Sequence, residues 1–431
     1  MTLGKSHSAN RMNAQDAAAL IARRELTSVA LVQSCLERIA ERDGAIGAWQ
    51  YLDPELALAQ ARACDACPAR GPLHGVPIGI KDVYDTVDMP TTYGSRIYSG
   101  HRPTRDTALV AALRRAGMVV LGKTVTTEFA SGFPAGTHNP RDLARSPGVS
   151  SSGSAAAVAD EMVPLATGTQ TGGSIIRPAA FCGVYGFKAS LDGFDRTGYR
   201  HCKPTLDTLG LLARSLDDIA IVHEAVTGVS PAGSVEAGPR IGLCRTPFRD
   251  DVSAPMMAAL ENAAGRLAAA GARVTEAALP APFRQLPQTW DVINAVESAR
   301  ALVREFDEGA QLMHPPLREK LAAGRNTSDT AYRAALDHAE RCRIALAALF
   351  DGYDVLLTPS AHGVATRLGE PGLPPTFNAF WTLLHVPCVG IPDFSGPDGL
   401  PLGLQLIGAV GTDSRFLALA RWIDARMQKT A

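Results

Sequence analysis

Three side chains in this sequence could carry out nucleophilic chemistry together: Lys81 in VPIGIKD, Ser150 in PGVSSSGSAAAVA and Ser174 in GTQTGGSIIRPA. A serine hydroxyl is a weak nucleophile until a base takes its proton, and a lysine is such a base where burial lowers its pKa. Lys81 ends an apolar run, which would supply that burial. Two glycines before Ser174 let the backbone turn tightly and direct several N–H groups at one point, as an oxyanion hole requires.

Each of these residues also has a structural interpretation. Lys81 could extend its amine toward solvent or pair with Asp82, and the serines could fill turns. Those interpretations do not explain why the three occur together. The combined pattern favours acyl transfer through a serine, with lysine as the base.

Other chemistries receive weaker support. Residues 117–124 match the spacing of a phosphate-binding loop, but the central Met-Val-Val-Leu predicts a strand instead. Cys64 and Cys67 have no second cysteine pair at zinc spacing, and the ten histidines include no H-E-x-x-H pattern. The G-x-S-x-G and S-x-x-K signatures of other serine hydrolases are absent. We therefore expect no metal and no cofactor.

The composition narrows the range of partners. The 431 residues carry 42 Lys and Arg against 43 Asp and Glu, so the net charge of −1 argues against a nucleic-acid partner. No apolar stretch has the length of a membrane span, and eight scattered cysteines are more typical of a reducing cytoplasm than of a disulfide framework. We expect a cytoplasmic protein that contacts no membrane and acts on a small molecule.

Strand and helix signals alternate along the chain and would position these residues. Asn13 is a candidate N-cap for a helix over 14–26, and Thr27 or Ser28 for a helix over 29–42. Further helices are expected over 54–66, 106–116, 253–270, about 291–350 and 413–427. Strands are expected over 76–82, 118–121, 163–167, 181–186, 240–244, 273–279, 354–358, 389–391 and 402–408. This alternation, without any linker, predicts one large α/β domain with a mainly parallel or mixed sheet covered on both faces.

Several of these segments, in this order, resemble the amidase signature family. They are GIKD, SPGVSSSGSAAAVA, GTQTGGSIIRPA, CGVYGFK, TPSA at 358–361 and GLPLGLQLIG at 399–408. Lys81 precedes Ser150 by 69 residues and Ser150 precedes Ser174 by 24, which suits that family's Ser-cisSer-Lys triad. The resemblance implies the amidase signature fold, a large mixed twisted β-sheet covered by helices on both faces. It also implies a single domain over 1–431, with a catalytic core at about 70–230 and a variable specificity region at about 245–385.

The resemblance assigns a role to each matching residue. Ser174 would be the acylated nucleophile, Ser150 the bridging serine preceded by a cis peptide, and Lys81 the base. The oxyanion hole would consist of the backbone N–H groups of Thr171, Gly172, Gly173 and Ser174. The implied activity is hydrolysis of the C–N bond of a small amide to a carboxylate and ammonia or an amine, through an acyl-enzyme.

The sequence departs from the family pattern at three positions. Val149 stands where a glycine usually precedes the cis bond, and a non-proline cis bond already costs roughly 3–4 kcal/mol. Ser152 also replaces a common glycine, and Gln170 replaces an aspartate found in many members.

Arg177 bears on the substrate. It follows the nucleophile by three residues, and the malonamidase-like branch has a similar segment in which the matching arginine holds a substrate carboxylate. The alternative is a structural ion pair or a backbone clamp beside Pro178, in which case an aryl or neutral amide is favoured. Aromatic residues of the specificity region could form the substrate wall, although such residues more often belong to the core: Trp290, His314, Phe377, Phe380 and Trp381.

Three other functions stay open at this point. The chain could be the glutamine-hydrolysing subunit of an amidotransferase complex, as in the family's tRNA-dependent members, or an aryl-amide or carbamate hydrolase of the same family. It could also be a scaffold that binds without turnover, with Val149 as the disabling change. The resemblance is compatible with a homodimer.

Overall fold

A computed structural model describes residues 6–132, 135–230, 238–245, 251–370, 374 and 376–428. Its centre is one mixed sheet of eleven strands in the order β1-β3-β2-β4-β6-β5-β10-β11-β9-β7-β8. The strands are β1 (Trp49–Leu52), β2 (Pro77–Lys81), β3 (Val119–Thr124), β4 (Leu165–Gln170), β5 (Tyr185–Lys188), β6 (Thr208–Ala213), β7 (Arg240–Leu243), β8 (Arg273–Glu276), β9 (Val355–Pro359), β10 (Cys388–Ser395) and β11 (Pro401–Ile407). Parallel pairs join β2 to β3 and β4, and β7 to β8 and β9. The other neighbouring pairs are antiparallel.

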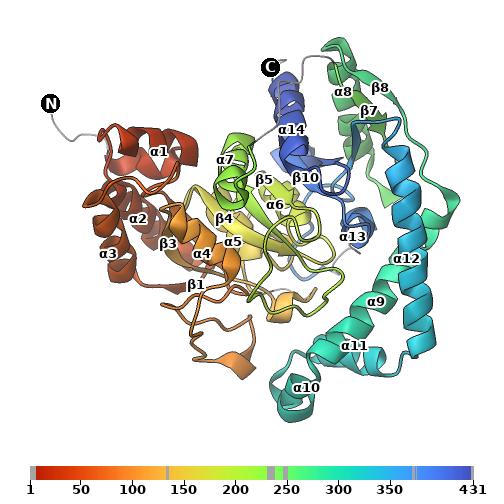
Figure 1. The fold of residues 1–431 in the computed structure, drawn as a ribbon, viewed down its shortest axis with the longest axis horizontal. Helices are drawn as coiled ribbons and strands as arrows, with labels where there is room; N and C mark the ends of the chain where they lie inside the picture. The colour runs from red at the N-terminus through yellow and green to blue at the C-terminus, as the bar shows by residue number, and fades with distance from the viewer. Residues whose placement is uncertain are drawn as a thin grey trace.

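Helices lie on both sides of this sheet (Figure 1). In the first half of the chain they are α1 (Ala14–Ala22), α2 (Ser28–Ile46), α3 (Pro54–Asp65), α4 (Ala108–Arg115), α5 (Ser152–Ala159), α6 (Ile176–Cys182) and α7 (Leu216–Thr227). In the second half they are α8 (Ala254–Ala269), α9 (Leu286–Ala301), α10 (Val303–Gly309), α11 (Pro315–Arg325), α12 (Asp329–Leu349), α13 (Thr376–Leu383) and α14 (Asp413–Met427). The architecture is the expected α/β class with a mixed sheet.

The inner strands are largely buried on both faces because neighbouring residues belong to two separate hydrophobic clusters, whereas the edge strands β1 and β8 are more exposed. On β3, Val120 belongs to one cluster while Val119 and Leu121 belong to the other. On β6, Leu211 and Leu212 divide in the same way. Side chains alternate between the faces of a strand, so this division places apolar layers on both sides of the sheet.

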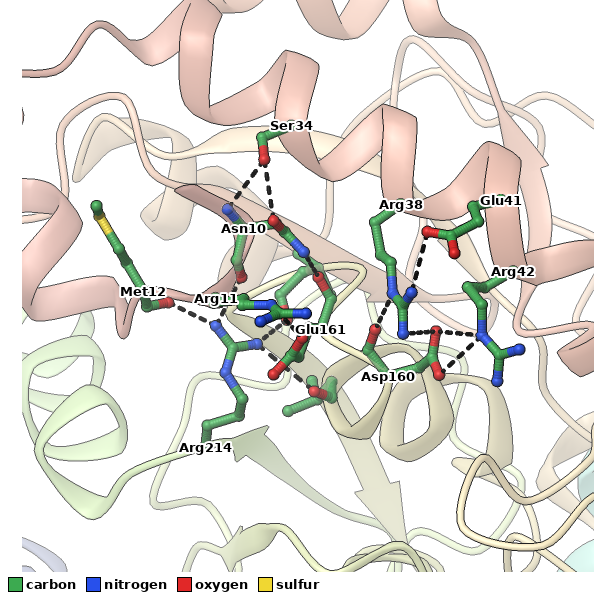
Figure 2. Close-up of polar contacts among 12 residues, drawn as sticks. Asn10, Arg11, Met12, Ser34, Arg38, Glu41, Arg42, Asp160, Glu161 and Arg214 are labelled. Carbon is green, nitrogen blue, oxygen red and sulfur yellow. Dashed lines mark hydrogen bonds and ion pairs between the residues drawn. The ribbon is translucent and has the colours of Figure 1, made fainter. Parts of the chain in front are cut away.

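The N-terminal helices are fastened to the end of α5 by arginines (Figure 2). Arg214, which follows β6, donates to the carbonyl oxygens of Asn10, Met12 and Val163 at 2.9, 2.5 and 2.9 Å. Arg38 on α2 pairs with Asp160 at 3.2 Å, just beyond the last residue of α5. These contacts fix the direction of α5, which begins next to Ser150.

The predicted helices and strands mostly occur where the sequence places them, but β1, β6, α5, α6, α7 and α13 were not predicted. Three of the predicted features also differ. The segment 181–186, expected as a strand, divides between the end of α6 and the start of β5. The helical stretch at 291–350 consists of α9, α10, α11 and α12 with breaks between them. Thr27 caps α2 by accepting a hydrogen bond from the Ala30 N–H, whereas the side chain of Asn13 makes no such bond to α1.

Two further expectations concern the local structure of motifs. Residues 119–124 form β3, so the centre of the phosphate-loop match is a strand, as predicted. All eight cysteines lie in described residues, and no disulfide joins any two of them. Within the described part of the chain, no helix has the length and apolar character needed to cross a bilayer.

Candidate active site

Lys81 is the last residue of β2 and lies in the interior of the sheet. Every residue of β2 is buried, and the Lys81 side chain is fully buried as well. Its backbone N–H donates to Thr167 Oγ1 on the neighbouring strand β4 at 2.9 Å. The lysine therefore has a fixed backbone position between β3 and β4.

Three hydroxyl oxygens surround the Lys81 amine. Nζ lies 2.8 Å from Ser150 Oγ, 3.0 Å from Ser151 Oγ and 2.7 Å from Thr169 Oγ1. All of these partners are neutral. A buried ammonium needs a counter-ion to offset its desolvation, and hydroxyl dipoles alone offset only part of it.

Burial accordingly lowers the pKa of Lys81 well below its usual range. The charge of Lys203 lowers this pKa further, while Asp207 raises it by a smaller amount than burial lowers it. On the adjacent strand β3, the equally buried Lys123 pairs with Asp82 at 3.2 Å. The contrast indicates that Lys81 is placed to hold a neutral amine, the form that can accept a proton.

The segment that contains Ser150 lies just before α5, and it packs closely against the segment that follows Ser174. Gly148 adopts φ +101°, and a Cβ on it would lie 2.5 Å from Pro178 Cα. Only glycine allows both the backbone angle and this close approach. Because Pro178 lies in α6, the contact fixes Ser150 and Ser151 relative to the helix that follows Ser174.

The expectation of a cis peptide before Ser150 is wrong for this structure. No cis peptide bond occurs among the described residues. The bond between Val149 and Ser150 is in the ordinary trans form, which is favoured by roughly 3–4 kcal/mol for a residue other than proline. The trans bond still leaves Ser150 Oγ in contact with Lys81.

The residues 171–174 form a turn between β4 and α6. Gln170 shapes this turn: its Oε1 accepts from the N–H groups of Ile175 and Ile176 at 2.9 and 3.0 Å, and its Nε2 donates to Thr382. A Cβ on Gly173 would lie 2.6 Å from Asn378 Oδ1, so the turn packs too closely for a side chain there. Gln170 thus caps the turn with an amide where many family members have a carboxylate.

The backbone N–H groups of the turn are available to a ligand. Among the described residues, those of Thr171, Gly172, Gly173 and Ser174 have no hydrogen-bond acceptor. All four residues line one cavity, as an oxyanion hole requires.

The structure brings the three predicted catalytic residues into one region, but it joins only two of them directly. Lys81 and Ser150 are in hydrogen-bond contact, and Ser174 lines the cavity. No hydrogen bond joins Ser150 to Ser174 in the described structure. Catalytic hydrogen bonds are often longer in a ligand-free site and shorten when substrate binds.

We call this space the Ser174 cavity, with a volume of about 150 Å³. It is lined by residues 130–132 and 171–174, together with Val149, Arg177, Lys203, Trp290, Asn294 and Lys320. The cavity is smaller than the roughly 300–1,000 Å³ typical of drug-sized ligands. It therefore suits a small substrate.

Two residues that support this site were not identified from the sequence. Asp207 accepts from the Thr171 hydroxyl at 2.5 Å through one oxygen, and from the N–H groups of Cys202 and Lys203 at 2.9 Å through the other. Thr169, which contacts Lys81, shares a strand face with Thr167. The alternating threonines of LATGTQT were a signal for the second of these, because residues two apart in a strand face the same way.

Of the residues expected to contact substrate, some line the Ser174 cavity and others do not. Arg177 lines the cavity, and its Nη2 donates to the Pro374 carbonyl at 2.7 Å, so part of the guanidinium holds the backbone. Burial lowers the pKa of Arg177 to about 10. Trp290 lines the cavity and donates to the Thr171 carbonyl at 2.9 Å. The other aromatics do not line it: Phe377, Phe380 and Trp381 are core residues, and His314 lies beside a different hollow.

Comparison with known proteins now identifies the family. The family model described as Amidase matches residues 30–417, most of the chain. The chain belongs to the amidase family. It is 34% identical over 476 aligned positions to a glutamyl-tRNA(Gln) amidotransferase subunit from Acidothermus cellulolyticus, covering 96% of this chain and 94% of that protein.

Solved amidase structures show the same fold. One amidase crystal structure superposes with a TM-score of 0.90 at 31% identity, covering 96% of this chain and all of the other. The native peptide amidase from Stenotrophomonas maltophilia superposes with a TM-score of 0.84 at 30% identity, covering 97% of each chain. The chain is therefore an amidase, a hydrolase that acts on amide C–N bonds, and it has the fold that the sequence predicted.

Proposed function

We propose that this amidase cleaves a small amide through an acyl-enzyme on Ser174, with Ser150 and Lys81 as its proton relay. Ser174 lines the cavity beside four available N–H groups. Ser150 contacts the buried Lys81 amine behind it. The observation that carries the proposal is this amine, which has hydroxyl partners on three sides and no carboxylate.

In the first half of the reaction, Ser174 Oγ bonds to the amide carbon as its proton passes to Ser150 Oγ. The proton of Ser150 passes at the same time to the neutral Lys81 Nζ. The carbonyl oxygen becomes an oxyanion, which accepts hydrogen bonds from the N–H groups of residues 171–174. When the C–N bond breaks, the leaving nitrogen takes a proton from Ser150, which regains one from Lys81.

The second half repeats these steps with water. Water bonds to the acyl carbon as its proton passes through Ser150 to Lys81. The bond to Ser174 Oγ then breaks, and the oxygen recovers a proton from Ser150. The products are a carboxylate and ammonia or an amine, and the relay returns to its starting protonation.

The specificity region at about 245–385 supplies one wall of the cavity in this proposal. Trp290, Asn294 and Lys320 come from α9 and α11, while the catalytic residues come from the core at about 70–230. The closer likeness to the malonamidase-like branch stays a proposal that depends on Arg177. Its bond to Pro374 supports a backbone clamp, and its place in the cavity supports contact with substrate.

A second function calls for a direct test because curated relatives belong to amidotransferase complexes. In that case the chain would hydrolyse glutamine and act with partner proteins. An amidase that works alone turns over simple amides without a partner, whereas a dedicated component of a complex depends on one. A homodimer and a cytoplasmic location also stay predictions.

The test uses purified full-length protein and a panel of malonamate, malonamide, aliphatic amides, anilides and glutamine. Release of ammonia or amine is followed for wild type, Ser174→Ala and Arg177→Ala. Ser152→Ala is the matched control, since its hydroxyl has no hydrogen-bond partner in the described structure. We expect turnover that Ser174→Ala abolishes and Ser152→Ala keeps.

The pattern across the panel separates the alternatives. Turnover retained by Ser174→Ala would overturn the proposed mechanism. Turnover of glutamine alone, and only with co-purifying proteins, would favour the amidotransferase function. If Arg177→Ala no longer hydrolyses the amides that carry an acid group, Arg177 binds the substrate. If it hydrolyses every amide of the panel as wild type does, Arg177 has the structural role of holding the backbone.

A further inference from the structure

One wall of the Ser174 cavity carries two lysines whose partners are neutral. Lys203 comes from the loop between β5 and β6, and Lys320 comes from α11. Lys320 Nζ donates to Asn294 Oδ1 at 2.9 Å, and Lys203 Nζ donates to the Phe129 carbonyl at 3.3 Å. Within the described residues, neither amine forms an ion pair, whereas Lys123 does.

The nearby carboxylates do not occupy this wall. Both oxygens of Asp207 are used by the Thr171 hydroxyl and by backbone N–H groups. Asp291 precedes Asn294 on α9, and its side chain is exposed to solvent. Asp207 and Asp291 raise the pKa of Lys320 by less than burial lowers it, and neither forms an ion pair with it in the described structure.

Neutral hydrogen-bonding groups complete the wall. Asn294 is 5% exposed; its Oδ1 accepts from Lys320, and its Nδ2 donates to no acceptor among the described residues. Ser131, 4% exposed, lines the same cavity, and its Oγ has no partner in the described structure. The buried Ser131 hydroxyl has no partner of its own, and together with the Asn294 amide and the two lysine amines it suits a ligand that accepts several hydrogen bonds.

We propose that Lys320, Asn294 and Lys203 form a carboxylate subsite, so that the substrate is a small amide carrying a negative charge. The inference rests on the proposed function, because it places the subsite in the cavity of the nucleophile. A carboxylate only accepts hydrogen bonds, and its two oxygens can take them from two ammonium groups and an amide. The subsite is distinct from Arg177, which donates to Pro374.

The electrostatics of the cavity agree with this role. Burial lowers the pKa of Lys320 to about 7, and the charge of Lys203 contributes to the shift. A bound anion would favour the protonated amine, because an opposite charge raises the pKa of a lysine. A bound carboxylate would therefore offset the repulsion between the two neighbouring cations.

The experiment compares succinamate with succinamide, which differ in one terminal carboxylate. The quantity measured is the selectivity, the ratio of kcat/KM for succinamate to that for succinamide. In Lys320→Met we expect it to fall roughly 10- to 100-fold through a higher KM for succinamate, the loss expected for one charge-assisted hydrogen bond. Arg318→Met is the matched control, because it removes an exposed cation from the same helix and should keep the wild-type selectivity.

A second variant guards against a folding defect. Asn294→Asp keeps the side-chain shape but pairs Lys320 with a built-in carboxylate, so the selectivity should fall in the same direction. Both variants are checked by thermal melting. Equal selectivity in wild type, Lys320→Met and Asn294→Asp would overturn the subsite, even if the enzyme turns over neutral amides well.

Direct binding separates this inference from the mechanism. Succinate, the product from succinamate, is titrated into Ser174→Ala protein by calorimetry, with and without Lys320→Met. Binding that Lys320→Met weakens roughly tenfold or more supports the subsite whether or not turnover is seen. Binding that is absent, or equal in both proteins, overturns it. Retained turnover in Ser174→Ala would instead overturn the proposed mechanism alone.

Discussion

Two buried lysines on adjacent strands should respond in opposite ways to the same substitution. Lys81 on β2 contacts three hydroxyls, and Lys123 on β3 pairs with Asp82 at 3.2 Å. Both side chains are fully buried. Replacing each with methionine removes the amine and keeps most of the apolar volume. The pair therefore separates a catalytic amine from a structural one.

For Lys81→Met, the structure predicts a large loss of activity and a small loss of stability. Removing a general base lowers kcat by about 10²- to 10⁴-fold, which corresponds to roughly 3–5 kcal/mol in the activation free energy. The three lost hydrogen bonds would cost about 1 kcal/mol each. Part of this loss is offset because methionine, unlike the amine, has little desolvation cost on burial. The free energy of unfolding should fall by no more than about 2 kcal/mol.

For Lys123→Met, the larger effect should be on stability. The substitution leaves the Asp82 carboxylate buried without its counter-ion, a change that costs roughly 3–5 kcal/mol. Its kcat should stay within about threefold of wild type for the folded fraction, because none of the hydrogen-bond or ion-pair partners of Lys123 lines the cavity.

The assay measures kcat from ammonia release with the best amide of the panel, and the free energy of unfolding from urea titration of the same preparations. Two results would refute the reasoning. One is a Lys81→Met protein with at least a tenth of wild-type kcat. The other is an equal loss of stability in both variants, which would mean that the two lysines have the same structural role.

Three further predictions follow from individual contacts. First, kcat should rise with pH through the lowered pKa of Lys81, because only the neutral amine accepts a proton; a kcat that is flat or falls over that range would contradict this. Second, Asp207→Asn should lower kcat roughly tenfold and the free energy of unfolding by about 1–3 kcal/mol. The reason is that the Thr171 hydroxyl or the N–H groups of Cys202 and Lys203 lose an acceptor. Steady-state kinetics measures the first effect and urea unfolding the second. Third, Arg214→Met should lower the free energy of unfolding by roughly 2–4 kcal/mol, because the carbonyls of Asn10, Met12 and Val163 lose their donor (Figure 2). The kcat of the folded protein should stay unchanged. A variant as stable as wild type would show that these three hydrogen bonds do not stabilise the fold.

The segments of the candidate site could be predicted from sequence because their residue types determine the local structure. Lys81 ends an apolar strand, and the glycines before Ser174 set a turn, so residue type and order carry most of the information. The strand predicted at 118–121 overlaps β3 for a similar reason, since Met-Val-Val-Leu favours a strand over a phosphate-binding loop. The expectation of a cis bond before Ser150 came only from the family pattern, and the structure does not have it.

The substrate wall could not be predicted, because it depends on packing between distant helices. Asn294 and Lys320 are 26 residues apart on α9 and α11, and they meet only because those helices pack against each other. Asp207 reaches back to Thr171 across 36 residues of sequence. The hydrophobic pattern of 291–350 indicates helices, but it does not show how these helices pack against one another. The aromatics of that region illustrate the point, since Trp290 reaches the cavity while Trp381 is core.

The central claim is that Ser174 is the nucleophile of this amidase. The most direct measurement is ammonia release from the best amide of the panel by wild type and Ser174→Ala, combined with mass spectrometry of wild type after treatment with a serine-directed fluorophosphonate. The account predicts a loss of at least about 10³-fold in kcat and a covalent adduct on the peptide that contains Ser174. Undiminished turnover by Ser174→Ala, or an adduct on another serine with full loss of activity, would contradict it.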